Sequence, residues 1–205
     1  MMHKHFDLTP LVDVVDTLLG PDGCPWDRAQ SHESMRKHMI EEAYEVCDAI
    51  DRKDTDNFRE ELGDVLFQVV FHAALVEKEG LFDLQGVIDE VADKMKRRHP
   101  RIYPPLDGSE VPLDWESIKR AEKAQKKQKQ TLPDGLPVLM KLDKLVGKLE
   151  KKGLCAEDIE TLCETPNEKA LLDAVACYRA NERPIELSAQ NLAKKMESRL
   201  VDTEE

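Results

Sequence analysis

Two acidic clusters with helical spacing place the strongest constraint on how this chain can fold. Glu42 and Glu45 lie three residues apart in the first cluster, as do Glu61 and Asp64 in the second. Residues three apart share one face of a helix, and apolar residues flank both clusters. Two helices that turned these faces toward each other would gather four carboxylates, which repel one another unless a cation lies among them. The spacing therefore predicts a helical hairpin with an oxygen-rich site that suits Mg²⁺ or Mn²⁺ rather than zinc.

The rest of the sequence is also typical of helices. Hydrophobic residues make up 40% of the 205 residues, charged residues 35% and aromatic residues only 5%. No segment alternates with period two for long enough to predict a strand, so we expect an all-α fold. From apolar spacing, caps and breakers, helices are expected at about residues 9–19, 31–52, 57–79, 84–99, 114–129, 138–152, 167–180 and 187–201.

A segment rich in proline and glycine, residues 131–137, predicts a domain boundary. We expect residues 1–130 to form the first domain and residues 131–205 to form a shorter helical C-terminal region. The segment after residue 100 is also rich in Pro and Gly, and it predicts an irregular loop inside the first domain.

A weak internal repeat relates the two predicted regions. When their apolar helical segments are aligned, Pro166 and Lys169 fall at the positions of Glu61 and Asp64. If the repeat is real, its second copy lacks the acidic site. The alternative is a chance similarity between amphipathic helices.

Composition narrows the possible partners and compartment. The net charge of −12 argues against general binding to a nucleic-acid backbone. No run approaches a membrane span, and the N-terminus lacks the apolar core of a secretory signal. We therefore expect a cytoplasmic protein that binds neither nucleic acid nor membrane. Its cysteines are widely spaced and odd in number, as in reduced intracellular proteins: Cys24, Cys47, Cys155, Cys163 and Cys177.

A basic segment near residue 97 stands out in this acidic chain. Lys94 and Arg98 are four residues apart and share a helix face, with Arg97 beside them. Both residue types bind phosphate oxygens well. The alternative is a cationic last turn that complements the helix dipole. Beside a metal cluster, phosphate binding is the better interpretation.

An aromatic loop precedes the first acidic helix. Trp26 could stack on a nucleobase, and His32 could donate a hydrogen bond to the base or sugar. Equally, Trp26 could pack the loop on the core, while His32 helps to cap a helix. For Trp115 we favour packing.

These motifs together resemble the MazG family of all-α nucleoside triphosphate pyrophosphohydrolases, over about residues 7–125. Beyond residue 133 the resemblance is weak, and the C-terminal region resembles a degenerate second MazG copy. The motifs that carry the resemblance are Gly23–Asp27, His32–Ser34, Glu41–Glu45, Glu60–Asp64 and Arg97–Pro100.

The resemblance implies a four-helix unit that hydrolyses nucleoside triphosphates between the α- and β-phosphates, giving the monophosphate and pyrophosphate. It also implies a homodimer or homotetramer. Mg²⁺, with Mn²⁺ as a possible substitute, would be held by Glu42, Glu45, Glu61 and Asp64. Glu41 would be a supporting catalytic carboxylate, either in the outer shell of the metal or helping to orient water. The triphosphate would be bound by Lys94, Arg98 and, more weakly, Arg97.

Three alternatives stay open at this point. The chain could be a pyrophosphohydrolase of one special nucleotide, such as dUTP, dCTP or phosphoribosyl-ATP. It could be a regulator that binds nucleotide and metal without catalysis. It could also be a helical adaptor, which would bind no Mg²⁺.

Overall fold

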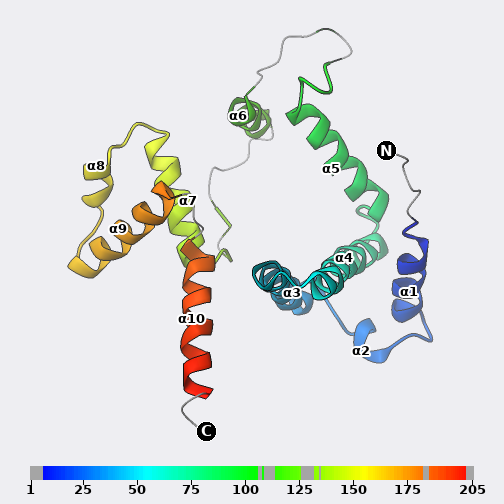
Figure 1. The fold of residues 1–205 in the computed structure, drawn as a ribbon. Helices are drawn as coiled ribbons and strands as arrows, with labels where there is room; N and C mark the ends of the chain where they lie inside the picture. Colours follow the sequence, from blue (N-terminus) through cyan, green and yellow to red (C-terminus); the bar gives the residue numbers. More distant parts are fainter. Residues whose placement is uncertain are drawn as a thin grey trace. The chain divides into compact units, whose positions relative to one another are not determined.

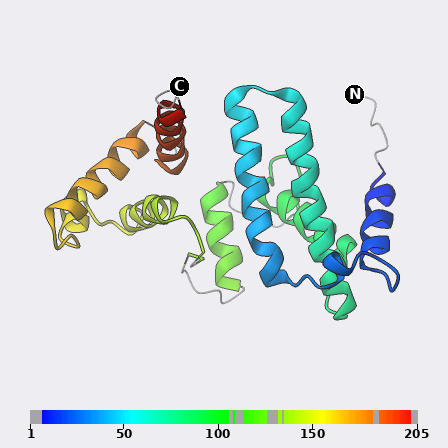
Figure 2. The same cartoon turned by 90° about the horizontal axis from the view of Figure 1, so that it is seen from below.

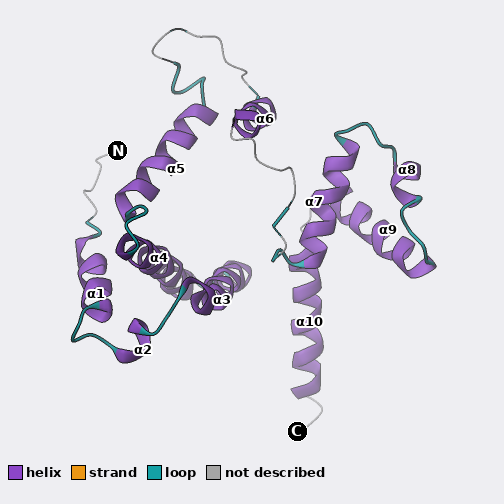
Figure 3. Cartoon of the chain, turned by 180° about the vertical axis from the view of Figure 1, so that it is seen from behind, coloured by secondary structure: helices purple, strands orange, loops and turns teal. Residues whose placement is uncertain are grey.

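The computed structural model describes residues 7–105, 108, 114–125, 132–133, 135–181 and 185–201. Every regular element within these ranges is a helix (Figure 3), so the predicted all-α class is confirmed. The chain divides into two compact units, Met1–Lys126 and Lys127–Glu205. The boundary predicted between residues 130 and 131 lies outside the described residues. None of the helices described here has both the length and the apolar composition needed to cross a bilayer.

The N-terminal unit contains six helices among its described residues (Figure 1). Five of them were expected from the sequence; α2 was missed because four residues are too few to show an apolar period. The helices are α1 (Thr9–Leu19), α2 (Pro25–Arg28), α3 (His32–Arg52), α4 (Thr55–Lys78), α5 (Leu84–Arg98) and α6 (Trp115–Gln125).

Helices α3 and α4 form the antiparallel hairpin that carries both acidic clusters (Figure 2). Ser31 caps α3, and its hydroxyl and that of Ser34 form a reciprocal capping box. The helix ends at Lys53, whose φ of 56° is left-handed. Asp54 then caps α4 by accepting a hydrogen bond from the backbone N–H of Asn57 at 3.1 Å. Two residues thus separate the helices, which fixes their ends close together.

The core of the N-terminal unit lies where α1 and α3 meet α4. Phe71 of α4 is fully buried there, and it packs with Val15, Leu19, Met35 and Val70. The core occupies the C-terminal half of α4. The acidic cluster of α4 lies in the N-terminal half, where the side chains are more exposed.

The C-terminal unit has its own core. Its helices are α7 (Val138–Glu150), α8 (Ala156–Glu160), α9 (Pro166–Ala180) and α10 (Ile185–Val201). Each contributes one buried aliphatic side chain: Val146, Ile159, Val175 and Ile185. Short α8 was not expected from the sequence, whereas the other three helices were.

Candidate metal centre

Three of the four predicted ligands come together in the hairpin. Glu42 and Glu45 project from α3, Glu61 projects from α4, and one carboxylate oxygen of each lies within 4.8 Å of the others. Glu42 and Glu61 are half-buried, whereas Glu45 is exposed. The structure thus brings carboxylates from both sequence clusters into one small volume.

The electrostatics of this cluster are repulsive. Partial burial raises the pKa of Glu42, and the nearby charges of Asp64 and Glu45 raise it further. In the part of the chain that the structure describes, no lysine or arginine forms an ion pair with Glu42, Glu45 or Glu61. Closely spaced carboxylate oxygens without a protein cation fit a hard divalent cation such as Mg²⁺.

Asp64, the fourth predicted ligand, lies beside the cluster rather than within it. Its carboxylate is close enough to Glu42 to raise the pKa of that group, yet it does not belong to the three-residue set. Asp64 is exposed, as is the preceding Gly63. A Cβ at Gly63 would meet nothing within 4 Å, so this side of α4 is open to a ligand.

Glu41 faces a different neighbour. Its Oε2 lies 2.9 Å from Nδ1 of His38, and its side chain is 59% exposed. The ring of His38 also makes an edge contact with Trp26, with centroids 6.3 Å apart. Glu41, His38 and Trp26 therefore form a small group in which His38 is half-buried and the other two are exposed.

A series of polar contacts that was not predicted from the sequence connects Asp48 to Glu61 through Arg52 and Asn57. Asp48 binds Nε of Arg52 at 2.9 Å. Nη2 of Arg52 donates to Oδ1 of Asn57, and Nδ2 of Asn57 donates to Oε1 of Glu61. Asn57 lies four residues before Glu61, a spacing that could have signalled the contact, but the link to Arg52 depends on the tight turn between the helices.

The basic turn of α5 is engaged with α6. Nε and Nη2 of Arg98 donate to Glu122 at 3.0 and 2.7 Å, and Arg97 lies 3.6 Å from the same carboxylate. Chiefly through the Arg98 hydrogen bonds, the pKa of Glu122 is lowered. Arg98 also lies over the ring of Trp115, 5.0 Å from its centroid. Glu122 already takes two of the donors with which Arg98 could bind phosphate.

Lys94 is placed differently from the two arginines. It lies one turn before Arg98 on α5 and is half-buried. No ion pair joins it to any residue that the structure describes. Of the predicted phosphate ligands, Lys94 is therefore the one whose charge is paired with no carboxylate among the described residues.

His32 pairs with a second histidine that was not singled out in the sequence. Its Nδ1 lies 2.7 Å from Nδ1 of His72 on α4, and the two rings are nearly parallel. Burial, together with the proximity of His32, lowers the pKa of His72. The pair ties the start of α3 to the middle of α4, and 40 residues of sequence separation hide it from local patterns.

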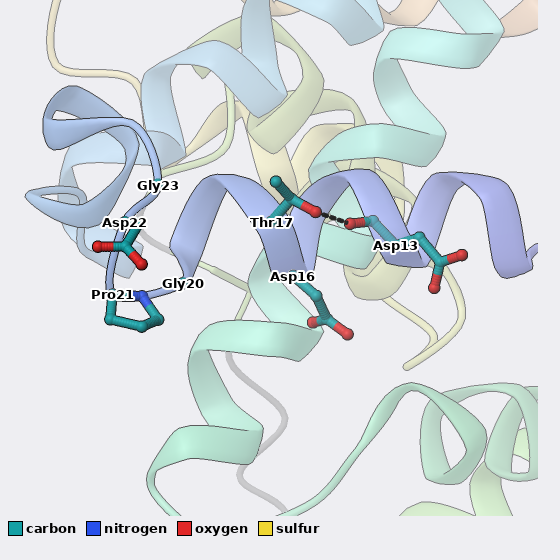
Figure 4. Close-up of a pocket in the computed structure, with 7 residues that line it drawn as sticks. All are labelled: Asp13, Asp16, Thr17, Gly20, Pro21, Asp22 and Gly23. Atoms are coloured by element: carbon teal, nitrogen blue, oxygen red, sulfur yellow. Dashed lines mark hydrogen bonds between the residues drawn. The ribbon is translucent and has the colours of Figure 1, made fainter.

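A surface hollow of about 480 Å³ lies at the C-terminal end of α1 (Figure 4). None of the predicted site residues lines it, and its three aspartates make it unsuited to a triphosphate anion. Its lining residues are Asp13, Asp16, Thr17, Gly20, Pro21, Asp22 and Gly23.

The region that contains the hairpin is similar in sequence to known proteins. Residues 30–103 match the model of the MazG nucleotide pyrophosphohydrolase domain. A nucleoside triphosphate pyrophosphohydrolase of Escherichia coli is 43% identical over 142 residues, which cover 66% of this chain and 54% of the relative. A nucleoside triphosphate pyrophosphohydrolase/pyrophosphatase MazG of Thermotoga maritima is 46% identical over 117 residues, 57% of this chain and 46% of the relative.

The chain spans about half the length of these two relatives. Among solved structures, the crystal structure of a mazG-related protein from Thermotoga maritima aligns with a TM-score of 0.44 at 27% identity. That alignment covers 58% of this chain and 99% of the solved one.

Proposed function

We propose that this chain hydrolyses nucleoside triphosphates to nucleoside monophosphates and pyrophosphate in a Mg²⁺-dependent reaction, a proposal supported by the match of residues 30–103 to the MazG nucleotide pyrophosphohydrolase domain. The observation that carries the proposal is the set of three carboxylates from α3 and α4 with ligand atoms within 4.8 Å of one another. Such a site is unfavourable in the folded protein unless a cation offsets the repulsion.

The metal would be held by Glu42, Glu45 and Glu61, with Asp64 as the fourth carboxylate at the open side of α4. When bound, Mg²⁺ would neutralise phosphate oxygens as charge develops on the leaving group. Mn²⁺ prefers the same oxygen ligands and would be a substitute.

Binding of the triphosphate falls first to Lys94, whose charge has no carboxylate partner among the described residues. Arg98 and Arg97 would add contacts from the next turn of α5, in competition with Glu122. Lys94 and Arg98 would stabilise the departing pyrophosphate.

The group around His38 would orient the attacking water and contact the nucleobase. Oε2 of Glu41 lies 2.9 Å from Nδ1 of His38 and can accept a hydrogen bond from it, and the exposed carboxylate would orient the water. Trp26 is 56% exposed, which leaves its ring accessible for stacking on a base. His32, in contrast, is already paired with His72, and its role would be to hold the start of α3.

The proposed assembly is a homodimer, with a homotetramer as the larger form. Apolar side chains on the outer faces of α3 and α4 support it, because Ile40, Leu62 and Leu66 are 45%, 46% and 40% exposed. A second copy that covered them would remove these apolar side chains from water. Light scattering after gel filtration measures the mass.

The proposal is tested by pyrophosphate release over a panel of canonical and damaged nucleotides, with and without Mg²⁺. Glu42→Ala and Asp64→Ala should abolish Mg²⁺-dependent turnover while the helical circular dichroism signal survives. Glu60→Gln is the matched control, because Glu60 is exposed on the same helix outside the cluster. Normal turnover in either alanine variant would contradict the assignment of the site.

The same panel reports on specificity. Release from one nucleotide alone would favour an enzyme for a special nucleotide such as dUTP, dCTP or phosphoribosyl-ATP. Binding of nucleotide and Mg²⁺ without pyrophosphate would favour a regulator that is not an enzyme. Contacts to the triphosphate and metal are common to all nucleotides, so the proposal expects release from several of them.

A further inference from the structure

We infer that Asn57 is a positioning residue for the metal centre: its amide, anchored by Arg52, holds one oxygen of Glu61 so that the other oxygen faces the cation. This inference rests on the proposed function, because it assigns a role toward the proposed metal. The geometry that carries it is the continuous chain from Asp48 through Arg52 and Asn57 to Glu61.

The chemistry of the two neighbours allows only one orientation of the Asn57 amide. A guanidinium has only donors, and an ionised carboxylate has only acceptors. The amide oxygen must therefore face Arg52 and the NH₂ group must face Glu61, as the structure has them. Arg52 is itself fixed by Asp48 at 2.9 Å, so each member of the chain restricts the next.

The fold makes this contact possible. Arg52 is the last residue of α3 and Asn57 lies in the first turn of α4. Only Lys53 and Asp54 separate the two helices, and Asp54 binds the backbone N–H of Asn57 at 3.1 Å. The backbone of Asn57 is thus fixed by the helix cap, while its side chain remains available to join the two helices.

A neutral amide has an advantage over a direct ion pair at this point. If Arg52 bound Glu61 directly, its charge would offset that of the carboxylate and compete with the metal. Asn57 orients the carboxylate through a hydrogen bond without cancelling its charge. Glu61 therefore keeps more of its attraction for a cation than in a direct ion pair, and it loses part of its rotational freedom before the cation arrives.

The test compares Mn²⁺ binding by three variants of the full chain, followed by the electron paramagnetic resonance signal of free Mn²⁺. Asn57→Leu removes both amide contacts in a side chain of similar size, and Arg52→Met removes the anchor alone. Arg59→Met is the matched control, because Arg59 pairs with Asp56 on the same turn at 3.3 Å, and both side chains are exposed and outside the three-carboxylate set. Melting temperatures without metal show whether each variant keeps its fold.

We expect Asn57→Leu to weaken Mn²⁺ binding by about tenfold, as is typical when a partner of a metal ligand is lost. Arg52→Met should weaken it less, and Arg59→Met should leave it unchanged. The Mg²⁺ concentration for half-maximal pyrophosphate release should rise in parallel with the loss of Mn²⁺ affinity. The value of kcat at saturating Mg²⁺ should change far less, because excess metal refills a weakened site. A purely structural defect would instead lower kcat at every Mg²⁺ concentration.

Two results would overturn the inference, and they are distinguishable. Equal Mn²⁺ affinity in the unaltered protein, in Asn57→Leu and in Arg52→Met would show that the metal site does not depend on Asn57. If the unaltered protein bound no Mn²⁺ and released no pyrophosphate, the proposed function itself would fail, and the inference with it.

Discussion

The glutamate cluster of the hairpin differs from the carboxylates of the C-terminal unit in how its charge is compensated. In the C-terminal unit, Arg179 binds Asp143 at 2.9 Å and Glu150 at 2.7 Å. Lys169 binds Glu160 at 2.7 Å and lies 3.8 Å from Asp173. In the hairpin of the N-terminal unit, by contrast, the clustered glutamates have no lysine or arginine partner among the described residues.

The difference shows where each group of carboxylates obtains its compensating charge. Where a protein cation lies among carboxylates, as at Lys169, the negative charge of the carboxylates is compensated without a ligand. Where it is missing, as around Glu42, folding leaves repulsion that an external cation can remove. In the predicted alignment of the two regions, Lys169 falls at the position of Asp64 and Pro166 at that of Glu61, so a cation of the C-terminal unit corresponds to a predicted metal ligand of the hairpin.

The largest expected effect follows from making the N-terminal unit resemble the C-terminal one. Asp64→Lys would place an ammonium beside Glu42, whose pKa the Asp64 charge now raises. We expect Mn²⁺ affinity to fall by about 100-fold or more, while the metal-free melting temperature rises. Isothermal titration and thermal denaturation in EDTA measure the two. Unchanged affinity would show that the comparison between Asp64 and Lys169 has no functional content.

A second change tests the other side of the comparison. Arg179→Met should destabilise the C-terminal unit by about 1–2 kcal/mol, because it removes hydrogen bonds to Asp143 and Glu150. Chemical denaturation measures the loss. Pyrophosphate release at a temperature where the variant is folded should be unaffected. A loss of turnover there would mean that the C-terminal unit takes part in the reaction.

The raised pKa of Glu42 predicts a pH dependence of stability. The folded, metal-free protein binds a proton at Glu42 more readily than the unfolded chain does. The free energy of unfolding therefore decreases as pH rises from the ordinary pKa of 4.5 through the raised pKa of Glu42. Glu42→Gln removes this loss. Its melting temperature in EDTA should therefore exceed that of the unaltered protein by a margin that grows with pH over this window. A margin that is constant with pH would contradict the pKa argument.

The smallest effect concerns the turn that sets the hairpin. Lys53 has a left-handed φ of 56°, which disfavours a side chain but not glycine. Lys53→Gly should stabilise the protein by about 0.5 kcal/mol, the relief of strain exceeding the added flexibility of the unfolded chain. Urea denaturation can resolve this change. Destabilisation would mean that the Lys53 side chain contributes to the hairpin.

Much of the fold could be predicted because its signals are local. Apolar spacing, Ser31 as a cap and the turn before Asn57 are all contained in short windows of sequence, and they gave the helices of the hairpin. The pairing of Glu42 with Glu61 needed one further step, the assumption that two acidic faces meet. Helix α2 was missed because a single turn has no periodicity.

Side-chain partners across helices could not be predicted in the same way. His32 meets His72, and Arg98 meets Glu122, only because separate helices pack together. Nothing in the neighbourhood of Arg98 in the sequence indicates that a carboxylate of α6 occupies part of its guanidinium. The structure therefore shows that Glu122 competes with a phosphate for Arg98. The metal-ligand roles and the nucleotide contacts remain predictions.

The most direct test of the central claim is an analysis of the products formed from ATP by ³¹P nuclear magnetic resonance, with Mg²⁺ present, for the unaltered protein and for Glu42→Ala. We expect AMP and pyrophosphate in equal amounts from the unaltered protein, and no product from the variant or in the presence of EDTA. Formation of ADP and phosphate, or equal turnover by Glu42→Ala, would contradict the claim that the carboxylates of α3 and α4 make this chain a pyrophosphohydrolase.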